Sequence, residues 1–365
     1  MARYYFSDIR LRVVLSVLLI ITLTILCWWS SGIEPAYRSG GIPYIKRDYG
    51  KNKNNLESRG KVVIKRYDLR IIAIVYNRAH SLLRLLNSLN EAEYGPDSIK
   101  LEVWIDRSEE GIVDRATLIT AKQFSFKHGE YEVLPHQHHV GIYGQWFTTW
   151  KPDVNSSEIA VILEDDLTVP KYFWRYLKLV HQKYDKNADI NGYSLQGYTI
   201  TFSEKNHHTF LTGPKDSIVF LFPVVGAWGF SPSTKNWNQF LSWFKTKNIS
   251  TFKPYVPDNI ATGWYKDLSS MGRANTMWEI WHIFYAWKNN EFTLYCNFPG
   301  RTGLTTNWRE KGLHAEKTEG SSNALITEWK TEYDNLPDNI TYLDLAGNVM
   351  EWKWKSTHKP YPDKV

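Results

Sequence analysis

The 365-residue sequence predicts an α/β fold, in which a mostly parallel sheet is covered by helices on both faces. Three apolar runs have the composition of strands buried on both faces, at 69–76, 101–105 and 159–163. Helical patterns alternate with these runs, and polar residues follow each of them directly. Ligands of such sheets bind at the carboxyl ends of the strands, so we expect a functional site there.

Each element has its own local signal. The run at 69–76 (LRIIAIVY) is uninterrupted, and leucines then recur at helical spacing over 81–89. The third run, IAVIL, ends in three consecutive acids. The remaining patterns predict a helix at 112–124, a short strand at 132–134 and a helix at 167–177 with Pro170 near its start.

The N-terminal region predicts a membrane anchor. Residues 13–29 (VVLSVLLIITLTILCWW) carry no charge, and about 17 apolar residues are near the lower limit for a helix that crosses a bilayer. Arginines precede this run and none follows closely, which predicts a cytosolic tail at 1–12 and a luminal stem at 30–66. A cleaved signal peptide ending near 30–32 is the alternative. Either reading places the remainder in the secretory lumen, and we expect a single-pass type II protein of the Golgi membrane.

The composition limits the classes of function that the protein can have. The net charge of +6 comes with no nucleic-acid-binding motif, so we expect no nucleic-acid partner. The 17 Trp, 22 Tyr and 16 Phe favour a carbohydrate-handling protein, because aromatic faces stack on sugar rings. Of the two cysteines, Cys27 lies in the anchor and Cys296 is alone in the folded part, which excludes a disulfide within it. Sequons at Asn155, Asn248 and Asn339 agree with a luminal location.

The acidic triplet Glu164-Asp165-Asp166 is the main candidate for chemistry. Adjacent carboxylates repel one another, and a cation relieves that repulsion. Mn²⁺ or Mg²⁺ chooses carboxylate oxygens and bridges them to a diphosphate. The alternative is an acidic N-cap on the helix expected at 167–177.

At this point the sequence resembles a known family. The segment from Ile159 to Phe173 (IAVILEDDLTVPKYF) is similar to the metal-binding segment of the Golgi N-acetylglucosaminyltransferases that initiate complex N-glycans, and of their O-mannose-directed relatives. Further similar segments follow the family order over residues 69–316: Tyr76-Asn77-Arg78, Asp106, 226–230 (GAWGF), 278–281 (WEIW) and 309–314 (REKGLH). The resemblance implies an inverting, manganese-dependent enzyme with a GT-A (Rossmann-like) catalytic domain at 67–318 and a C-terminal extension at 319–365.

The resemblance also implies roles for individual residues. Arg78 and Asp106 would hold uridine, Glu164 would face the donor sugar, and Asp165 would face the ribose. Asp166 would bind the metal, with His314 as a second ligand. On the phosphate and acceptor side we expect Trp228, Arg309 and Lys311. The donor would be a UDP-sugar, UDP-N-acetylglucosamine in the family, and the acceptor a glycan or glycoconjugate.

Glu279 is the candidate general base. Inversion by direct displacement needs one carboxylate to take the proton of the acceptor hydroxyl, and a Glu between two tryptophans has a pKa raised by desolvation. The alternative is that Glu279 is an ordinary helical residue, beside two tryptophans that pack in the core. The family has two adjacent acids here, whereas this chain has Ile280 in the second position.

Two other classes of function remain open. A glycoside hydrolase using Asp166 and Glu279 needs neither metal nor nucleotide. A non-catalytic carbohydrate-binding protein on a decayed transferase fold is the other. For the cluster at 136–139 (HQHH), the alternatives are a metal site and a polar loop.

Overall fold

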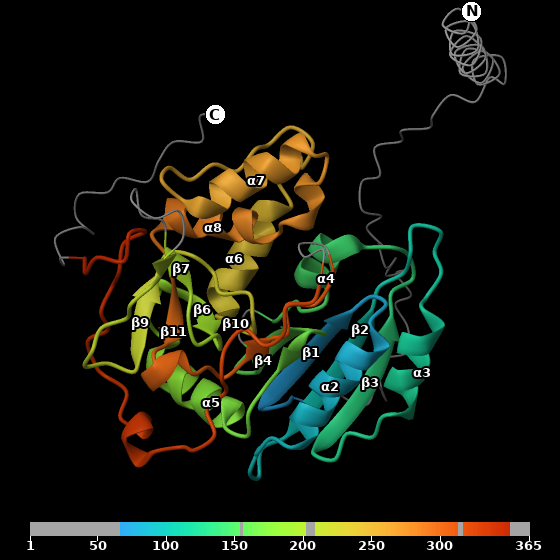
Figure 1. Cartoon of the computed structure of the whole chain (residues 1–365), viewed down its shortest axis with the longest axis horizontal. Coiled ribbons are helices and arrows are strands. Elements are labelled where there is room, and N and C mark those ends of the chain that lie inside the picture. Colours follow the sequence, from blue (N-terminus) through green and yellow to red (C-terminus); the bar gives the residue numbers. More distant parts are fainter. Residues whose placement is uncertain (1–65, 154–155, 202–208, 313–316, 351–365) are drawn as a thin grey trace, which may run out of the picture. The chain divides into compact units, whose positions relative to one another are not determined.

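The computed structural model describes residues 66–153, 156–201, 209–312 and 317–350 (Figure 1). The predicted tail, anchor and all but the last residue of the stem lie outside these ranges, as does His314. Across the described ranges, no helix has the length and apolar character that crossing a membrane requires.

The centre of the fold is a sheet to which eight strands of the described residues contribute. They are β1 (Leu69–Val75), β2 (Ile99–Ile105), β3 (Gly129–Pro135), β4 (Ile159–Glu164), β6 (Ile190–Ser194), β9 (Val219–Phe222), β10 (Phe230–Pro232) and β11 (Phe292–Cys296). The spatial order is β3-β2-β1-β4-β10-β6-β11-β9. β1 to β4 pair in parallel, as do β6 and β11, whereas β10 and β9 pair antiparallel to their neighbours. The predicted mostly parallel sheet is therefore confirmed.

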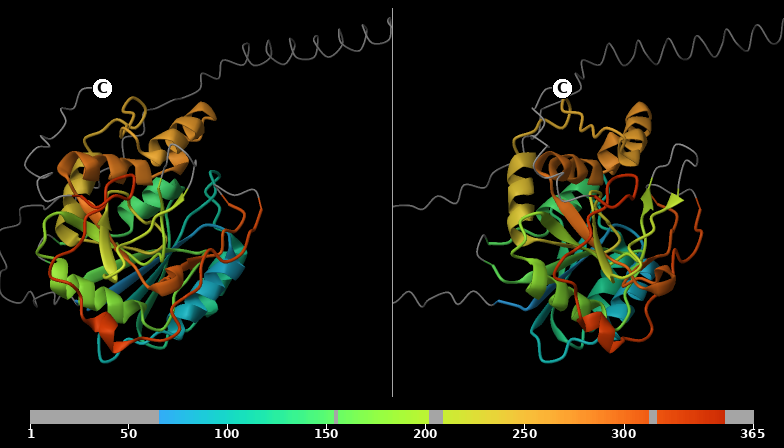
Figure 2. Two further views of the ribbon diagram at one scale, coloured as in Figure 1. Left: turned by 60° about the vertical axis from the view of Figure 1, so that its left-hand side comes forward. Right: turned by 90° about the vertical axis from the view of Figure 1, so that its left-hand side faces the viewer.

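Helices cover both faces of this sheet (Figures 1 and 2). Alternate residues of β1 belong to two different cores, Leu69 and Ile71 to one and Ile72 and Ile74 to the other. The first core includes α2 (Ala79–Asn90), α3 (Arg115–Gln123) and α5 (Phe173–Tyr184). The second includes α4 (Gly141–Thr148), α6 (Thr234–Phe244), α7 (Ile260–Ser270) and α8 (Glu279–Asn289).

Short elements complete the described chain. Two small antiparallel pairs join β5 (Leu167–Thr168) to β12 (Thr306–Asn307) and β7 (Ile200–Thr201) to β8 (Thr209–Phe210). Single 3-10 turns are η1 (Ala274–Thr276), η2 (Pro299–Arg301) and η3 (Thr331–Asp334). Beyond residue 318, Ile326, Tyr333 and Leu336 enter the first core, so this part of the chain packs onto the same domain.

One predicted element is wrong in its first half. The helix expected at 167–177 begins only at Phe173, because Leu167 and Thr168 pair with Asn307 and Thr306 instead. The N-cap of α5 is Tyr172, so the acidic triplet does not cap a helix. The alternative structural reading of that triplet is thereby excluded.

Candidate active site

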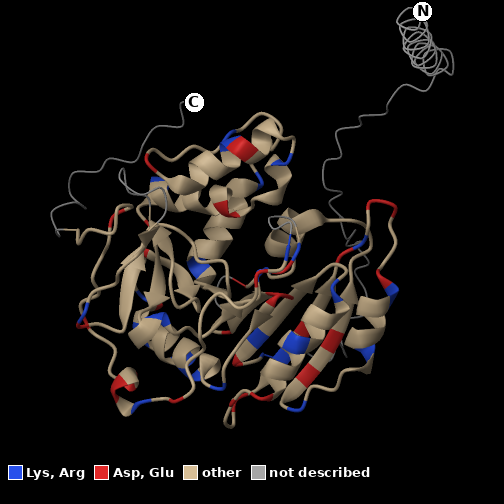
Figure 3. Ribbon diagram, in the orientation of Figure 1, with Lys and Arg blue, Asp and Glu red and all other residues tan. Residues whose placement is uncertain are grey.

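The site lies at the carboxyl edge of the sheet, where the parallel strands end. Arg78 follows β1, Asp106 follows β2, and the triplet at 164–166 ends β4. Because these strands are parallel neighbours, their ends meet at one edge. Figure 3 shows acidic and basic positions close together in the middle of the molecule, near these ends.

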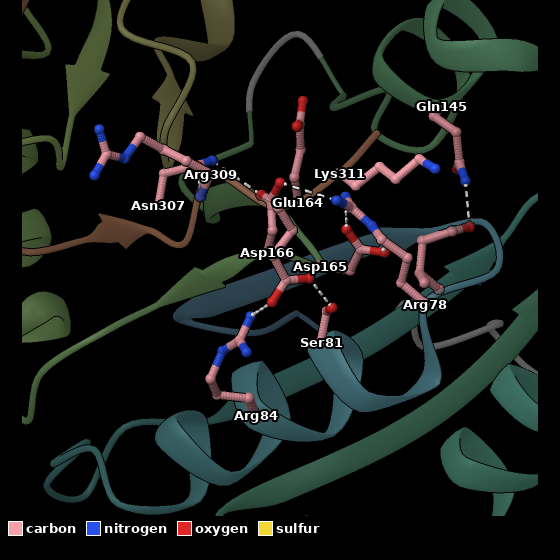
Figure 4. Close-up of polar contacts among 12 residues, drawn as sticks. Arg78, Ser81, Arg84, Gln145, Glu164, Asp165, Asp166, Asn307, Arg309 and Lys311 are labelled. Carbon is pink, nitrogen blue, oxygen red and sulfur yellow. Dashed lines mark hydrogen bonds and ion pairs between the residues drawn. The ribbon is translucent and has the colours of Figure 1, made fainter. Parts of the chain in front are cut away.

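Arg78 joins the ends of β1 and β4. Its guanidinium pairs with Asp165 through two nitrogens, with Nε 3.1 Å from Oδ2 and Nη2 bonded to Oδ1. A third nitrogen, Nη1, donates to Asp166 Oδ2 at 3.2 Å (Figure 4). Arg78 occupies the N-cap position of α2, but its side chain does not cap that helix. This forked contact suits a planar guanidinium and would not be reproduced by lysine.

Asp166 is also held from the far side of the site. Asn307 donates its amide to Oδ1 at 3.0 Å, and the Trp308 N–H donates to the Asp166 carbonyl at 2.9 Å. The last residue of β12 and the residue after it thus fix Asp166 through its side chain and its backbone, respectively. Sequence reasoning did not identify Asn307, because the contact depends on pairing between segments that are far apart in the chain.

The triplet carries more negative charge than its surroundings neutralise. Burial, together with the neighbouring charges of Asp166 and Glu279, raises the pKa of Glu164 to about 8. Burial likewise raises the pKa of Asp165 and Asp166, against the opposing effect of Arg78. Asp166 retains lone pairs, since each of its oxygens accepts one hydrogen bond from a side chain.

These features fit a divalent cation at Asp166. The described residues contain no group of three His, Cys, Asp or Glu side chains arranged to hold a metal by themselves. A Mg²⁺-type site with one or two protein carboxylates completes its shell from substrate phosphates and water, so a single ligand such as Asp166 suffices. His314, the expected second ligand, lies outside the described residues.

Glu279 lies at the start of α8 and contributes to the same site. Its side chain is half-buried, and within the described structure its Oε2 is buried without a hydrogen-bond partner. Burial raises the pKa of Glu279 to about 7. Its charge acts on Glu164, which also accepts a hydrogen bond from Trp146 Nε1 at 3.0 Å.

The residues beside Glu279 belong to the core. Trp278 is 1% exposed and stacks on Trp146 with ring centroids 3.9 Å apart. Trp281 and Ile280 are fully buried in the second core. The packing role considered for the two tryptophans is therefore confirmed. Of residues 278–281 only Glu279 is not fully buried, and an acid in place of Ile280 would lie in the core rather than the site.

Asp106 has a different environment. Its Oδ1 accepts from the N–H groups of Arg107 at 2.8 Å and Val140 at 2.9 Å, and its Oδ2 accepts from Gly141 at 2.9 Å. His139 approaches Oδ2 at 3.2 Å. Asp106 therefore anchors the loop that begins α4 at the edge where the other candidates lie.

The cluster at 136–139 is a polar loop. His136 bonds to Gln145 Oε1 at 3.0 Å, and Gln145 donates to the carbonyl of Val75 at 2.9 Å. His139 bonds instead to the carbonyl of Arg107 at 2.6 Å. The two histidines have separate partners, and burial lowers the pKa of His136.

The loop at 226–230, which is expected on the acceptor side, is shaped by close contacts of its backbone. A Cβ at Gly226 would come within 2.2 Å of Ser194 Oγ, and Gly229 has φ of +83°. Between them, Trp228 is half-buried, with its ring 5.8 Å from that of Tyr198. Its carbonyl accepts from Thr305 Oγ1 at 2.6 Å, which ties the loop to the residue before β12.

The two basic residues expected near the phosphates, Arg309 and Lys311, point in different directions. The Arg309 guanidinium donates to the carbonyls of Gly320 at 3.0 Å and Ser321 at 3.2 Å, and it pairs with Glu319. It therefore belongs to the neighbouring loop. Lys311 is exposed and is drawn in the region of Arg78 in Figure 4.

Comparison with known proteins does not assign the chain to a family. Neither a family model nor a curated protein matches it. Among 283 matching chains of solved structures is a mannosyltransferase from Pyrobaculum calidifontis in complex with GDP-Man and Mn²⁺, with 13% identity and a TM-score of 0.32, covering 50% of this chain and 47% of that one. TarS 1–349 from S. aureus has 10% identity and a TM-score of 0.36, covering 64% of this chain and 61% of that one.

A complex of TarS 1–349 with UDP-GlcNAc gives 10% identity and a TM-score of 0.34, covering 63% of this chain and 58% of that one. The chain thus spans about half to three fifths of the length of these proteins. TM-scores in this range do not establish a shared fold, so the site's own geometry has to carry the functional assignment.

Proposed function

We propose that this chain is a metal-dependent, inverting glycosyltransferase of the GT-A type, which moves a sugar from a UDP-sugar to a glycan or glycoconjugate. One observation carries the proposal. An acidic triplet only partly neutralised by Arg78 ends a central parallel strand and lies beside Glu279, whose Oε2 is buried without a hydrogen-bond partner among the described residues. Donor binding and proton removal need these two kinds of group next to each other.

The donor side follows from the triplet and its neighbours. Asp166 would hold Mn²⁺ or Mg²⁺, which would supply positive charge against the diphosphate. Asp165 faces the ribose, and Glu164 faces the transferred sugar. The resemblance assigns Arg78 to uridine, but its guanidinium bonds to Asp165 and Asp166, so we assign it to the phosphates beside Asp166 instead. Asp106 contributes by fixing the 139–141 loop beside the nucleoside, with lone pairs left to accept from it.

The reaction is a single displacement in which Glu279 is the base. Its carboxylate takes the proton from the acceptor hydroxyl while that oxygen forms its bond to the anomeric carbon of the donor. The bond from this carbon to the phosphate oxygen breaks, and the nucleoside diphosphate leaves with the electron pair. Attack from the face opposite the leaving group inverts the anomeric centre.

The resemblance in the sequence supports the finer assignments. N-acetylglucosamine is proposed as the transferred sugar, with His314 as a further metal ligand and Trp228 beside the acceptor. Of the two basic residues expected at the leaving group, only Lys311 keeps that role, because the contacts of Arg309 with residues 319–321 make it a support of the neighbouring loop. The apolar run at 13–29 supports a type II Golgi membrane protein with a luminal catalytic domain.

Calorimetric binding of UDP and UDP-sugars tests this function, with and without Mn²⁺, on the wild-type chain and on Asp166→Asn. We expect Mn²⁺-dependent binding of UDP in the wild type and its loss in the variant. Asp338→Asn is the matched control, because that carboxylate is 92% exposed and pairs with Lys183 on α5. A folded wild-type chain that binds no UDP would refute the proposed donor.

Glycoside hydrolysis is the second candidate, because two carboxylates that interact with each other, Glu164 and Glu279, both have a raised pKa. The sequence had suggested Asp166 rather than Glu164 for this pair. Hydrolysis needs neither nucleotide nor metal. Glycan cleavage that persists in a chelator would support it, whereas UDP binding without transfer would support a carbohydrate-binding protein.

A further inference from the structure

Glu310 connects the segment at 307–312 to α2, the first helix of the domain. Its two carboxylate oxygens accept from the Ser81 hydroxyl and from the Arg84 guanidinium, both on α2. The Glu310 side chain is 15% exposed and that of Arg84 is 21% exposed. Although burial raises the pKa of Glu310, the bonds from Ser81 and Arg84 outweigh this and lower it, so Glu310 is ionised at neutral pH.

The same segment is attached to the metal-binding candidate on its other side. Asn307 and Trp308 hold the side chain and the carbonyl of Asp166. The Trp308 ring lies under Arg84, with the guanidinium carbon 4.5 Å from the ring centroid. Residues 307–310 therefore bridge the end of β4 and α2, with Arg84 contacting two members of the bridge.

Beyond Glu310 the chain passes over Arg78. A Cβ at Gly312 would lie 3.4 Å from Arg78 Nη1, so the backbone after Lys311 is next to the guanidinium that holds the triplet. The Lys311 N–H bonds to Thr318 Oγ1 at 3.4 Å. Lys311 is exposed and is drawn near Arg78 in Figure 4, and the attachment at Glu310 lies immediately before it in the chain. The segment therefore places a second cation near the guanidinium that holds the triplet.

We propose that Glu310 is a positioning residue for the donor diphosphate, which it serves by fixing residues 307–312 to α2 so that Lys311 and Arg78 face the same phosphates. This inference rests on the proposed function, since it takes the ligand to be a nucleoside diphosphate. Glu310 does not itself contact the ligand, because an anion beside a diphosphate is repulsive. It acts through Arg84 and the backbone that carries Lys311.

The test is the affinity of Glu310→Gln for UDP and for uridine in the presence of Mn²⁺. Glutamine keeps the size and a hydrogen bond to Ser81 but removes the charge that Arg84 requires. Loss of a hydrogen bond to a charged group predicts that UDP binds about 10-fold more weakly. Uridine, which has no phosphate, binds with unchanged affinity. General damage to the fold would weaken both ligands equally and would overturn the inference.

Arg84→Gln and the double variant complete the experiment. If Glu310 acts through Arg84, each single variant loses UDP affinity by a similar factor and the double variant loses no more. Independent, multiplying losses would contradict the inference. Glu319→Gln is the control, because Glu319 pairs with Arg309 in the adjacent loop, and its UDP affinity should equal that of the wild type. A wild type that does not bind UDP refutes the proposed function itself, whereas unchanged UDP binding by Glu310→Gln refutes only the role of Glu310.

Discussion

The two ends of α8 carry the same kind of group in different surroundings. Glu279 begins the helix, Glu291 follows its end, and within the described residues each has one carboxylate oxygen buried without a partner. Burial raises the pKa of both, to about 7 for Glu279 and about 8 for Glu291. Glu279 is half-buried beside Glu164, whereas Glu291 is only 6% exposed and immediately precedes β11.

β10 is antiparallel to both β4 and β6, so β6 and its parallel neighbour β11 run in the same direction as β4. The start of β11 therefore lies at the edge of the sheet opposite the strand ends that form the candidate site. A raised pKa therefore does not by itself identify a catalytic carboxylate. Access to the carboxyl edge of the sheet distinguishes Glu279 from Glu291. This difference can be tested by giving the two residues the same substitution.

The largest expected effect is on turnover. Glu279→Gln should lower kcat by about 10²–10⁴-fold, because it removes the general base, while the affinity for UDP stays near that of the wild type. The wild-type rate should rise with pH through about 7, since only the deprotonated carboxyl of Glu279 accepts a proton. Steady-state kinetics over pH 5–9 measures both effects.

Glu291→Gln is the matched control for that experiment. It replaces a second buried glutamate of raised pKa with glutamine, and its kcat should equal that of the wild type. Equal losses of kcat in the two variants would show that α8 is simply sensitive to substitution. Unchanged turnover in Glu279→Gln would remove Glu279 from the mechanism.

The sequence predicted the parts of this molecule that depend on local pattern. The first four parallel strands lie at the predicted positions, with boundaries that differ by at most a few residues. Three of them are compact apolar runs bounded by polar residues, whereas β3 (GEYEVLP) was predicted only as a short strand at 132–134. Arg78 and the triplet at 164–166 come together as expected, since the ends of neighbouring parallel strands must meet. Local pattern was therefore sufficient for one half of the candidate site.

The other half depends on contacts that local pattern does not contain. Leu167 was assigned to a helix, but it pairs with Asn307 in β12. The bond from Trp146 to Glu164 and the attachment of Glu310 to α2 join segments with no shared periodicity. Tertiary pairing decided these positions, and propensity did not indicate them.

Asp106 adds a third carboxylate to the comparison of Glu279 with Glu291, and the expected effect of its substitution is intermediate in size. Asp106 is also buried, but three backbone N–H groups satisfy its oxygens. Asp106→Ala should cost about 2–3 kcal/mol of folding stability, because it leaves these donors unpaired, and it should weaken UDP binding through the 139–141 loop. Denaturant unfolding and calorimetry measure the two changes. A variant as stable as the wild type would show that water replaces the carboxylate at no cost.

The smallest effect concerns Glu291 and stability. Because burial raises its folded-state pKa from 4.5 to about 8, its favourable contribution to folding is complete below about pH 4.5 and is lost as the pH rises through about 8. Glu291→Gln imitates the neutral acid, so it should stabilise the protein by about 1–2 kcal/mol at pH 8.5 and have little effect at pH 5. Unfolding curves at the two pH values measure this difference. A variant less stable than the wild type at pH 8.5 would mean that the hydrogen bond from Asn236 stabilises ionised Glu291 by more than burial destabilises it, and the similarity between the two ends of α8 would no longer hold.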